Sequence, residues 1–367
     1  MADAAATSPS ARHRPPPRRA TGPLHWVHRR FFNGAHNVVL TLAIAWALVL
    51  IVPDLLAWSV LDAVWTGPGS ACRSAGGACW AIVAEKYRLI LFGTYPYEEH
   101  WRATLAMAII IVLAVASGFE RFWSYGLFAV WVVALGAVFT LMFGGVLGLA
   151  PVGTHEWGGL PLTLVIFIGT VVGGLPLAVL LALGRRSELP VVKALCVGLI
   201  EITRGVPLIT VLFMASLMLP LFMPEGVTVD KLLRAQLGMI IFFAAYAAEI
   251  VRGGLQAIPY GQTEAANAVG LTYWQRTRRI ILPQALRIVI PPLMNDIIRA
   301  FKNTTFVSIV GLFDVLGATS AAIQDPEWVL YAPEAYLFIF ALYFVFCFAM
   351  SKYSESVERK LATGRNF

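Results

Sequence analysis

The sequence has little charge and no nucleotide-binding or catalytic motif. Asp, Glu, Lys and Arg make up only 13% of its 367 residues, about half the fraction usual in a soluble domain. No Gly-x4-Gly-Lys-Ser/Thr phosphate loop occurs, nor any Gly-Lys dipeptide, which excludes an ATPase acting alone. A His-Glu-x2-His motif and a nucleophile elbow are also missing, and the six His residues are scattered. We therefore expect no enzyme, no metal and no cofactor.

Long apolar runs are abundant, and they indicate an all-α integral membrane protein. Hydrophobic residues form 58% of the chain and the mean hydropathy is +0.73. A bilayer is crossed by ~20 apolar residues, and about eight runs have that character. Pro291-Pro292 predicts a break or kink in the seventh run. The runs are 35–57, 104–119, 123–149, 159–184, 194–222, 236–258, 284–317 and 335–351.

Basic residues predict the orientation of the spans. Positive charge stays on the cytoplasmic side of membrane proteins, so the clusters should share that side. With eight spans they do, whereas the loop around Asp325, Glu327 and Glu334 has no Lys or Arg. Both termini are therefore expected in the cytoplasm, and the net charge of +7 reports topology rather than nucleic-acid binding. The basic clusters fall within 12–30, 185–193, 276–287 and 352–365.

The chain divides into four regions. Residues 1–33, rich in Arg, Pro, Ala and Ser, are predicted to be a disordered cytoplasmic tail. Three spans with an outer insertion follow in 34–157, and five spans with most of the unusual charges fill 158–353. Residues 354–367 form a second cytoplasmic tail. The first apolar run is too long for a cleavable signal and lacks a small-residue cleavage site, so we expect it to remain an anchor.

The chain has only four Cys residues. Cys72 and Cys79 lie outside the cytoplasm in this topology, where they could form a disulfide or remain two free thiols. No further Cys or His stands near them, so a metal site is not expected. Cys196 and Cys347 fall within spans and are expected to be packing residues.

Charges inside the apolar runs are candidates for a polar pathway or gate. Each costs a few kcal/mol facing lipid, so they should pair or line a polar interior. Glu201/Arg204, Glu249/Arg252 and Asp296/Arg299 are spaced i, i+3, which places each pair on one helix face. They could neutralise each other or face a zwitterionic substrate, and the spacing leaves both open. The candidates for the substrate pathway or gate are Glu201, Arg204, Glu249, Arg252, Asn295, Asp296, Lys302, Asn303 and Thr304.

Predicted helix breaks also lie in the spans that carry these charges, 158–353. Gly169, Gly173, Gly174 and Pro176 should loosen the fourth span and allow close helix approach. Gly205-Val206-Pro207 is predicted to interrupt the fifth span. Broken helices in a membrane persist where protein or water satisfies the freed backbone groups, as at a substrate pathway. Simple kinks that serve packing remain the alternative.

A polar hinge loop separates the sixth and seventh spans. Glu264-Ala265-Ala266, three residues, Gly270, nine residues and Ile280-Ile281-Leu282-Pro283 form its pattern. Gly270 can take the left-handed conformation that ends a first short helix. Thr272 and Gln275 form a capping-box pattern that starts a second, which Pro283 should end.

This pattern resembles the cytoplasmic coupling loop of bacterial ABC-importer permeases. Glu201-Ile-Thr-Arg204-Gly205-Val-Pro207, the segment 244–259 and Phe301-Lys302-Asn303-Thr304-Thr305 resemble the polar amino acid uptake branch, and within it the large permease of general L-amino-acid importers. Members usually carry Lys-Asp-Thr-Ser where this chain has Lys302-Asn303-Thr304-Thr305, so an ion pair at position 303 is not expected. The resemblance covers roughly 158–362 and the loop from Cys72 to Trp101.

The resemblance implies a type I permease core of five helices, with three extra helices before it. It implies an importer that moves L-amino acids from periplasm to cytoplasm by alternating access. The expected partners are an ABC ATPase dimer that binds ATP and magnesium, a second, related permease and a periplasmic amino-acid-binding protein. Loop 259–283 would couple the chain to the ATPase through Glu264, Ala265, Ala266, Gly270, Ile280, Leu282 and Pro283. The location implied is the inner membrane.

Two other readings of the sequence remain. A secondary transporter or channel, driven by an ion gradient, would explain the intramembrane charges but not the loop motif. The second is a membrane scaffold or receptor that does not transport, such as a signalling partner of an ATPase.

Overall fold

The computed structural model describes residues 22–122, 125–146 and 148–363, and in these ranges the chain is helical and forms no strand. The predicted all-α class is therefore confirmed. The chain separates into two compact units, which are described in turn. The smaller holds the described residues up to Val64 together with 71–78, and the larger holds 65–70 and everything from Cys79 onward.

Membrane-spanning helices account for most of the chain. In the described ranges seven helices are long and apolar enough to cross a bilayer, and a bent pair brings the number to eight if it is one span. Each of the eight predicted apolar runs overlaps one of these. The spans are Ala35–Leu61, Tyr97–Ser117, Gly126–Phe143, Gly159–Arg185, the pair Pro190–Gly205 and Leu208–Phe222, Lys231–Gln256, Tyr273–Val310 and Val329–Lys360.

The smaller unit contains helices α1 (Pro23–Phe31) and α2 (Ala35–Leu56), the latter prolonged by a π-helical turn, Ala57–Leu61. Helix α1 lies in a segment predicted to be disordered. Proline at its start and basic residues in its last turn favour a helix, because they suit the backbone and the dipole at those ends. The rest of the predicted tail, residues 1–21, lies outside the described residues. A short helix, α3 (Gly69–Ser74), follows.

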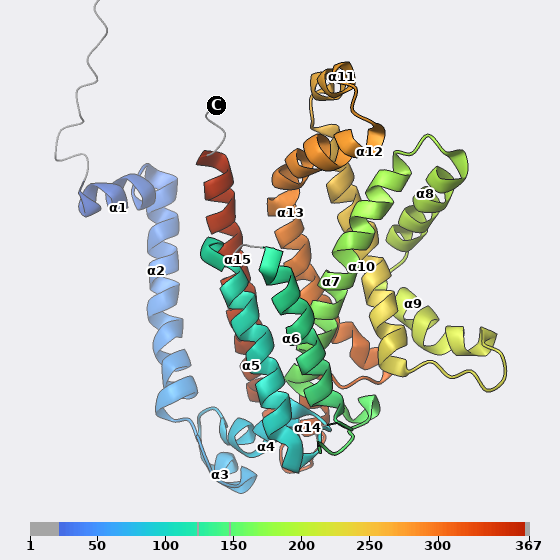
Figure 1. Cartoon of the computed structure of the whole chain (residues 1–367). Helices are drawn as coiled ribbons and strands as arrows, with labels where there is room; N and C mark the ends of the chain where they lie inside the picture. The colour runs from blue at the N-terminus through green and yellow to red at the C-terminus, as the bar shows by residue number, and fades with distance from the viewer. Residues whose placement is uncertain (1–21, 123–124, 147, 364–367) are drawn as a thin grey trace, which may run out of the picture. The chain divides into compact units, whose positions relative to one another are not determined.

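The larger unit is a bundle whose two ends differ (Figure 1). One end, here called the loop end, carries α11 and α12, and the other, the far end, carries α4 and α14. The helices are α4 (Ala81–Phe92), α5 (His100–Ser117), α6 (Tyr125–Phe143), α7 (Gly159–Arg185), α8 (Pro190–Gly205), α9 (Leu208–Phe213), α10 (Lys231–Gln256), α11 (Tyr260–Ala268), α12 (Tyr273–Arg276), α13 (Leu282–Asn303), α14 (Val315–Ala322) and α15 (Ala332–Thr363).

Helices α7 and α10 form the centre of the bundle, and glycines of α7 let them approach closely. A Cβ at Gly169 would lie 2.9 Å from the Gln236 side chain, and one at Gly174 would lie 2.5 Å from Phe243. Small residues permit such contacts between helices in a membrane. Pro176 is accommodated inside α7, which stays continuous over 27 residues. The predicted close approach is therefore present, but α7 itself is not interrupted.

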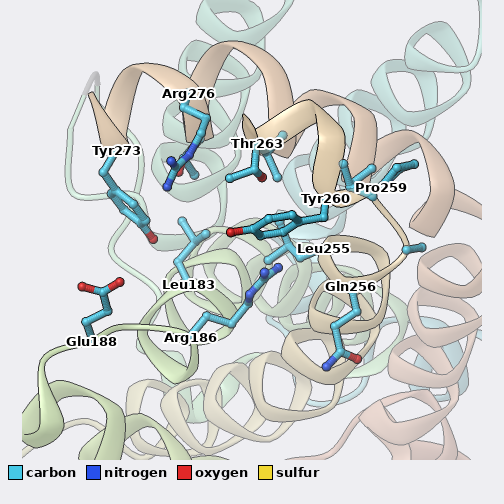
Figure 2. Close-up of a pocket in the computed structure, with 14 residues that line it drawn as sticks. Leu183, Arg186, Glu188, Leu255, Gln256, Pro259, Tyr260, Thr263, Tyr273 and Arg276 are labelled. Atoms are coloured by element: carbon cyan, nitrogen blue, oxygen red, sulfur yellow. The ribbon is translucent and has the colours of Figure 1, made fainter. Parts of the chain in front are cut away.

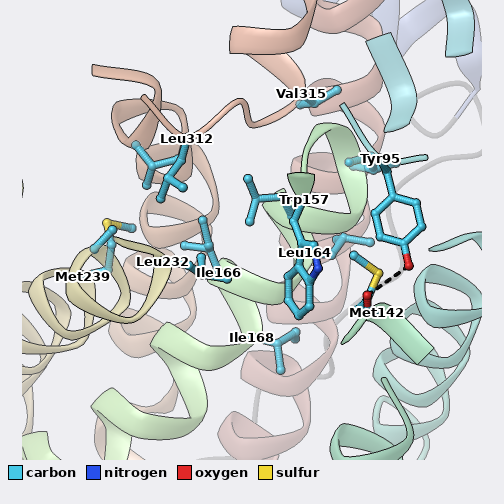
Figure 3. Close-up of a cluster of buried hydrophobic side chains, with 14 of the residues drawn as sticks. Tyr95, Met142, Trp157, Leu164, Ile166, Ile168, Leu232, Met239, Leu312 and Val315 are labelled. Atoms are coloured by element: carbon cyan, nitrogen blue, oxygen red, sulfur yellow. Dashed lines mark hydrogen bonds between the residues drawn. The ribbon is translucent and has the colours of Figure 1, made fainter. Parts of the chain in front are cut away.

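A cluster of buried hydrophobic side chains, with Trp157 and Tyr95 among them, lies toward the far end (Figure 3). Trp157, only 1% exposed, lies just before α7, and its indole nitrogen donates to the carbonyl of Val152 at 3.3 Å. Tyr95, just before α5, donates its hydroxyl proton to the carbonyl of Met142 at 3.0 Å. Burial raises the pKa of Tyr95 above its usual 10.0. The Tyr95 contact joins the segment before α5 to the end of α6, whereas the Trp157 contact is local to the segment before α7.

The predicted break at Gly205-Val206-Pro207 is confirmed, whereas no break is found at Pro291-Pro292. Helix α8 ends at Gly205 and α9 begins at Leu208, with a bend of 111° between them. Helix α13, in contrast, runs without interruption through Pro291 and Pro292. Consecutive prolines lack two amide donors, yet packing of Val289 and Leu293 in the core holds the helical path. The last helix, α15, also continues past the predicted span end, to Thr363.

Candidate functional site

The hinge loop forms two short helices, as its sequence predicts. Helix α11 ends in a Schellman motif, in which Leu271 donates to the carbonyl of Ala266 at 3.1 Å and Gly270 donates to that of Asn267 at 2.9 Å. Gly270 has φ of 75°, the left-handed conformation that suits glycine. Ala266 is 2% exposed, whereas Glu264 and Ala265 face outward.

The second helix begins with the predicted capping box. The Thr272 hydroxyl accepts from the Gln275 amide at 3.4 Å, and the Gln275 side chain accepts from the Thr272 amide at 3.0 Å. The prediction that Pro283 ends this helix is wrong. A π-helical turn, Thr277–Ile281, joins α12 directly to α13, and Pro283 occupies the first turn of α13, where its missing amide costs little. Ile280 and Leu282 are half-buried at this junction.

The two loop helices are tied together and present a surface to the outside. Arg276 of α12 donates to the side-chain oxygen of Asn267 of α11. Val269 is 73% exposed and Trp274 69% exposed, at the turns that flank Gly270. The sequence analysis did not predict that Val269 and Trp274 form part of this surface, because it considered only the fixed positions of the motif. Exposed apolar residues beside Glu264, on a polar loop, are typical of a surface that binds another protein.

Three helices, α7, α8 and α10, meet at Glu249 of α10, whose side chain is only 15% exposed. The Arg252 Nη2 atom lies 2.9 Å from one carboxylate oxygen. Arg185 Nη1, from the end of α7, lies 2.9 Å from the other, and Arg204 Nη1 of α8 lies 3.6 Å away. Arg185 also binds Glu201 of α8 at 2.7 Å. We call Arg185, Glu201, Arg204, Glu249 and Arg252 the charge cluster.

The predicted i, i+3 pairs are formed in two of three cases. Glu249 binds Arg252, and Asp296 accepts from Arg299 Nε at 2.8 Å. Glu201 and Arg204 instead each bind a residue of another helix. The reason is Arg185, which sequence reasoning counted only as a topology signal. Since it sits at the last residue of α7, its side chain reaches both α8 and α10.

Tyr246 links the charge cluster to α13. Its hydroxyl donates to the Arg204 carbonyl at 3.5 Å, and its ring lies 5.5 Å from the Arg204 guanidinium. The Arg299 guanidinium lies 4.2 Å from the same ring centre, within the range of a cation–π contact. Asp296 and Arg299 thus continue the polar interior from the loop end toward the middle of the bundle.

The remaining candidates on α13 do not all join this interior. Asn295 is exposed and Asn303 half-buried. Thr304 is fully buried, and its hydroxyl donates to the carbonyl of Phe301 at 2.8 Å. Lys302 lines a different groove, with Tyr336 and Tyr343 of α15.

Cys196 and Cys347 are free. Cys72 and Cys79 belong to different compact units, and a disulfide between them stays a prediction. Across the described ranges, no group of three or more His, Cys, Asp or Glu residues could hold a metal ion.

Spans that enclose shared charges, together with an exposed helical loop at one end, define the membrane subunit of a transporter. The family model described as "binding-protein-dependent transport system inner membrane component" matches residues 174–363. The chain belongs to this family and is an ABC transporter permease, a multi-span protein of the inner membrane.

Full-length relatives extend the match to the first spans. The chain is 45% identical over 355 residues to the inner membrane amino-acid ABC transporter permease protein YhdY of Escherichia coli K12, with 96% of each chain covered. It is 38% identical to the glutamate/glutamine/aspartate/asparagine transport system permease protein BztC of Rhodobacter capsulatus, covering 95% of this chain and 96% of that one. A solved amino acid ABC transporter with histidines is 31% identical, covers 55% of this chain and 92% of that one, and has a TM-score of 0.49.

Proposed function

We propose that this permease carries polar L-amino acids from the periplasm to the cytoplasm, driven by an ATPase on a separate chain. The observation that carries the proposal is the hinge loop, in which a Schellman motif and a capping box present Glu264 and an apolar rim on the exposed surface of two short helices. No phosphate loop occurs in the sequence, so energy has to arrive through such a surface.

The loop end is suited to pass force into the membrane. Helix α12 continues through the π-helical turn into α13, and α10 leads into α11 with only three residues between them. Movement of the loop by an ATPase would therefore tilt α10 and α13. The charge cluster joins α7, α8 and α10 near this end, so the same tilt would open or close its contacts. ATP and magnesium belong, in this proposal, to the ATPase partner.

Orientation follows from the charges at the two ends of the larger unit. The loop end carries Arg185, Arg186, Arg278 and Arg279, whereas the far end carries Asp325, Glu327 and Glu334. Basic residues remain in the cytoplasm, which places the loop end inside and the far end toward the periplasm. The C-terminal end of α15 then lies on the cytoplasmic side, and with eight spans we expect the N-terminus on the same side.

The charge cluster favours a substrate with a carboxylate. Three arginines face two glutamates there, which leaves one positive charge in a polar interior. Asp296 and Arg299 balance each other. A free amino acid brings a carboxylate for the arginines and an ammonium group for the glutamates. The names of the two full-length relatives specify amino acids, which supports the same class of substrate.

The proposed assembly contains four kinds of chain. One hinge loop serves one ATPase subunit, so an ATPase dimer requires two permeases related by a two-fold or pseudo-two-fold axis. We expect a second, related permease as the partner and a periplasmic amino-acid-binding protein at the far end.

Reconstitution in proteoliposomes tests the function. The complex should accumulate labelled amino acid only with binding protein outside and ATP inside, and a panel of unlabelled amino acids should reveal the cargo by competition. Uptake that follows an ion gradient without ATP would instead support a secondary transporter. Assembly with the ATPase but no uptake of any amino acid would support a scaffold.

A further inference from the structure

A cleft of about 720 Å³ lies at the loop end, between the loop helices and the connection from α7 to α8 (Figure 2). Its size falls within the range of pockets that bind small molecules. Its lining includes Tyr260, Thr263 and Tyr273 of the predicted coupling loop, but none of the seven residues named for coupling and none of the predicted pathway residues. Gln256, which also lines it, accepts a hydrogen bond from Arg252 of the charge cluster at 2.8 Å.

Charged side chains of both signs face the cleft from the α7–α8 connection. Arg186 and Glu188 line it, and Figure 2 shows both charged groups directed toward the hollow. Neither side chain belongs to any ion pair in the described part of the chain. Arg185, the neighbour of Arg186, forms ion pairs with Glu201 and Glu249 in the charge cluster. Arg186 and Glu188 therefore present charges that the protein itself does not use.

The loop helices supply the opposite wall. Arg276 and Tyr273 of α12 line it, and the Arg276 guanidinium lies 5.6 Å from the Tyr273 ring centre. Tyr260 of α11 completes this wall, and the phenol groups of both tyrosines reach into the hollow (Figure 2). Two guanidinium groups, one carboxylate and two phenols around one cavity match a small molecule that carries a carboxylate and an ammonium group.

We infer that this cleft binds a free L-amino acid from the cytoplasm, with its carboxylate on Arg186 and Arg276 and its ammonium group on Glu188. The inference rests on the proposed function, since the imported product is the amino acid that would accumulate on this side. A bound amino acid connects the α7–α8 segment to the hinge loop. It thereby holds the loop against the bundle and slows transport when product accumulates.

Binding to the assembled complex, in detergent and without the binding protein, tests the site. The probes are labelled L-glutamine, its des-amino analogue and its decarboxylated analogue. The variants are Arg186→Gln and Glu188→Gln, and Lys193→Gln is the matched control, because it removes an exposed charge from nearby α8 outside the cleft. Arg186→Gln should weaken glutamine binding about tenfold, the effect of losing a charge-assisted hydrogen bond.

The analogues distinguish a zwitterion site from a general anion site. Wild-type and Lys193→Gln complexes should prefer glutamine to both analogues, whereas Glu188→Gln should bind glutamine and the des-amino acid alike. The inference is overturned if Arg186→Gln, Glu188→Gln and Lys193→Gln bind glutamine equally well. It is also overturned if the assembled complex binds no glutamine, as it would if the ATPase filled the cleft.

Uptake in proteoliposomes separates this inference from the proposed function. Glutamine loaded inside should slow uptake by the wild type and by Lys193→Gln, and should have less effect on Arg186→Gln. Normal ATP-driven uptake that internal glutamine never slows would overturn the cleft site and leave the importer intact. No ATP-driven uptake at all would overturn the proposed function itself.

Discussion

The two ends of the larger unit use charge in different ways. At the loop end, Glu249 and the arginines of three helices bind one another through side chains alone. At the far end Asp325 pairs with Lys86, but two other carboxylates bind backbone amides: Glu327 accepts from Gly69 at 2.8 Å, and Glu334 accepts from Cys79 at 3.1 Å. Side-chain pairs can exchange partners without disturbing the main chain, whereas a carboxylate on a backbone amide fixes a segment in place. We therefore expect the ion pairs at the loop end to rearrange during transport, and the carboxylate–amide hydrogen bonds at the far end to keep their segments in place.

The largest expected effect is at the centre of the charge cluster. Glu249→Gln leaves three arginines without their shared carboxylate, so the contacts among α7, α8 and α10 no longer form in the same way. Uptake should fall tenfold or more, corresponding to about 1.4 kcal/mol. Assembly, followed by size-exclusion chromatography, should be unchanged. Glu201→Gln is the control, because that side chain is 54% exposed and should matter less. Normal uptake by assembled Glu249→Gln complex would remove Glu249 from the mechanism.

The second effect concerns the connection of the loop end to the ATPase. Gly270→Glu forces a side chain with a Cβ and a negative charge into the left-handed turn, at a cost of roughly 1 kcal/mol for the backbone. ATP hydrolysis should then lose its dependence on substrate delivery, and uptake should fall several-fold. Gly270→Asn is the control, since asparagine tolerates this conformation. If Gly270→Glu transports at the wild-type rate, the turn has no coupling role.

The third effect tests the rigidity of the far end through pH. Asp314 is fully buried at the start of α14 and accepts from the Gly317 amide at 2.9 Å. Burial raises its pKa from the usual 3.8 to about 6, so the folded protein binds this proton more tightly than the unfolded chain. Between those two values the free energy of unfolding should decrease as pH rises, by on the order of 3 kcal/mol in total.

Asp314→Asn keeps a good helix cap but removes the titrating group. Thermal unfolding of the variant in detergent should show a flatter profile from about pH 4 to pH 6 than the wild type. It should also be more stable than the wild type at pH 7. A profile identical to that of the wild type would show that Asp314 does not titrate in this window.

The smallest effect is expected from an exposed pair at the same end. Lys86 lies 2.7 Å from Asp325 and holds the pKa of that carboxyl below its usual 3.8. The pair therefore stabilises the fold above about pH 4 and loses this contribution as pH falls through the lowered pKa. Asp325→Asn should change the melting temperature at pH 7 only slightly, because exposed ion pairs contribute little. A large drop would mean that this pair organises the far end.

Local patterns in the sequence predicted local structure well. The Schellman turn at Gly270, the capping box at Thr272 and the break at Gly205-Val206-Pro207 all depend on residues within one or two helical turns. Contacts between distant segments were not predictable in the same way. Arg185 meets Glu249 across 64 positions, and Glu334 meets Cys79 across 255. The break expected at Pro291-Pro292 is absent, because core packing maintains the helix against the local preference of proline.

Reconstituted transport measures the central claim most directly. The complex of this permease, its partner permease and the ATPase is placed in proteoliposomes, with the binding protein and a labelled amino acid outside. We expect the labelled amino acid to accumulate only when ATP is inside, and to continue to accumulate after ion gradients are collapsed. Accumulation that needs an ion gradient and proceeds without ATP would contradict it.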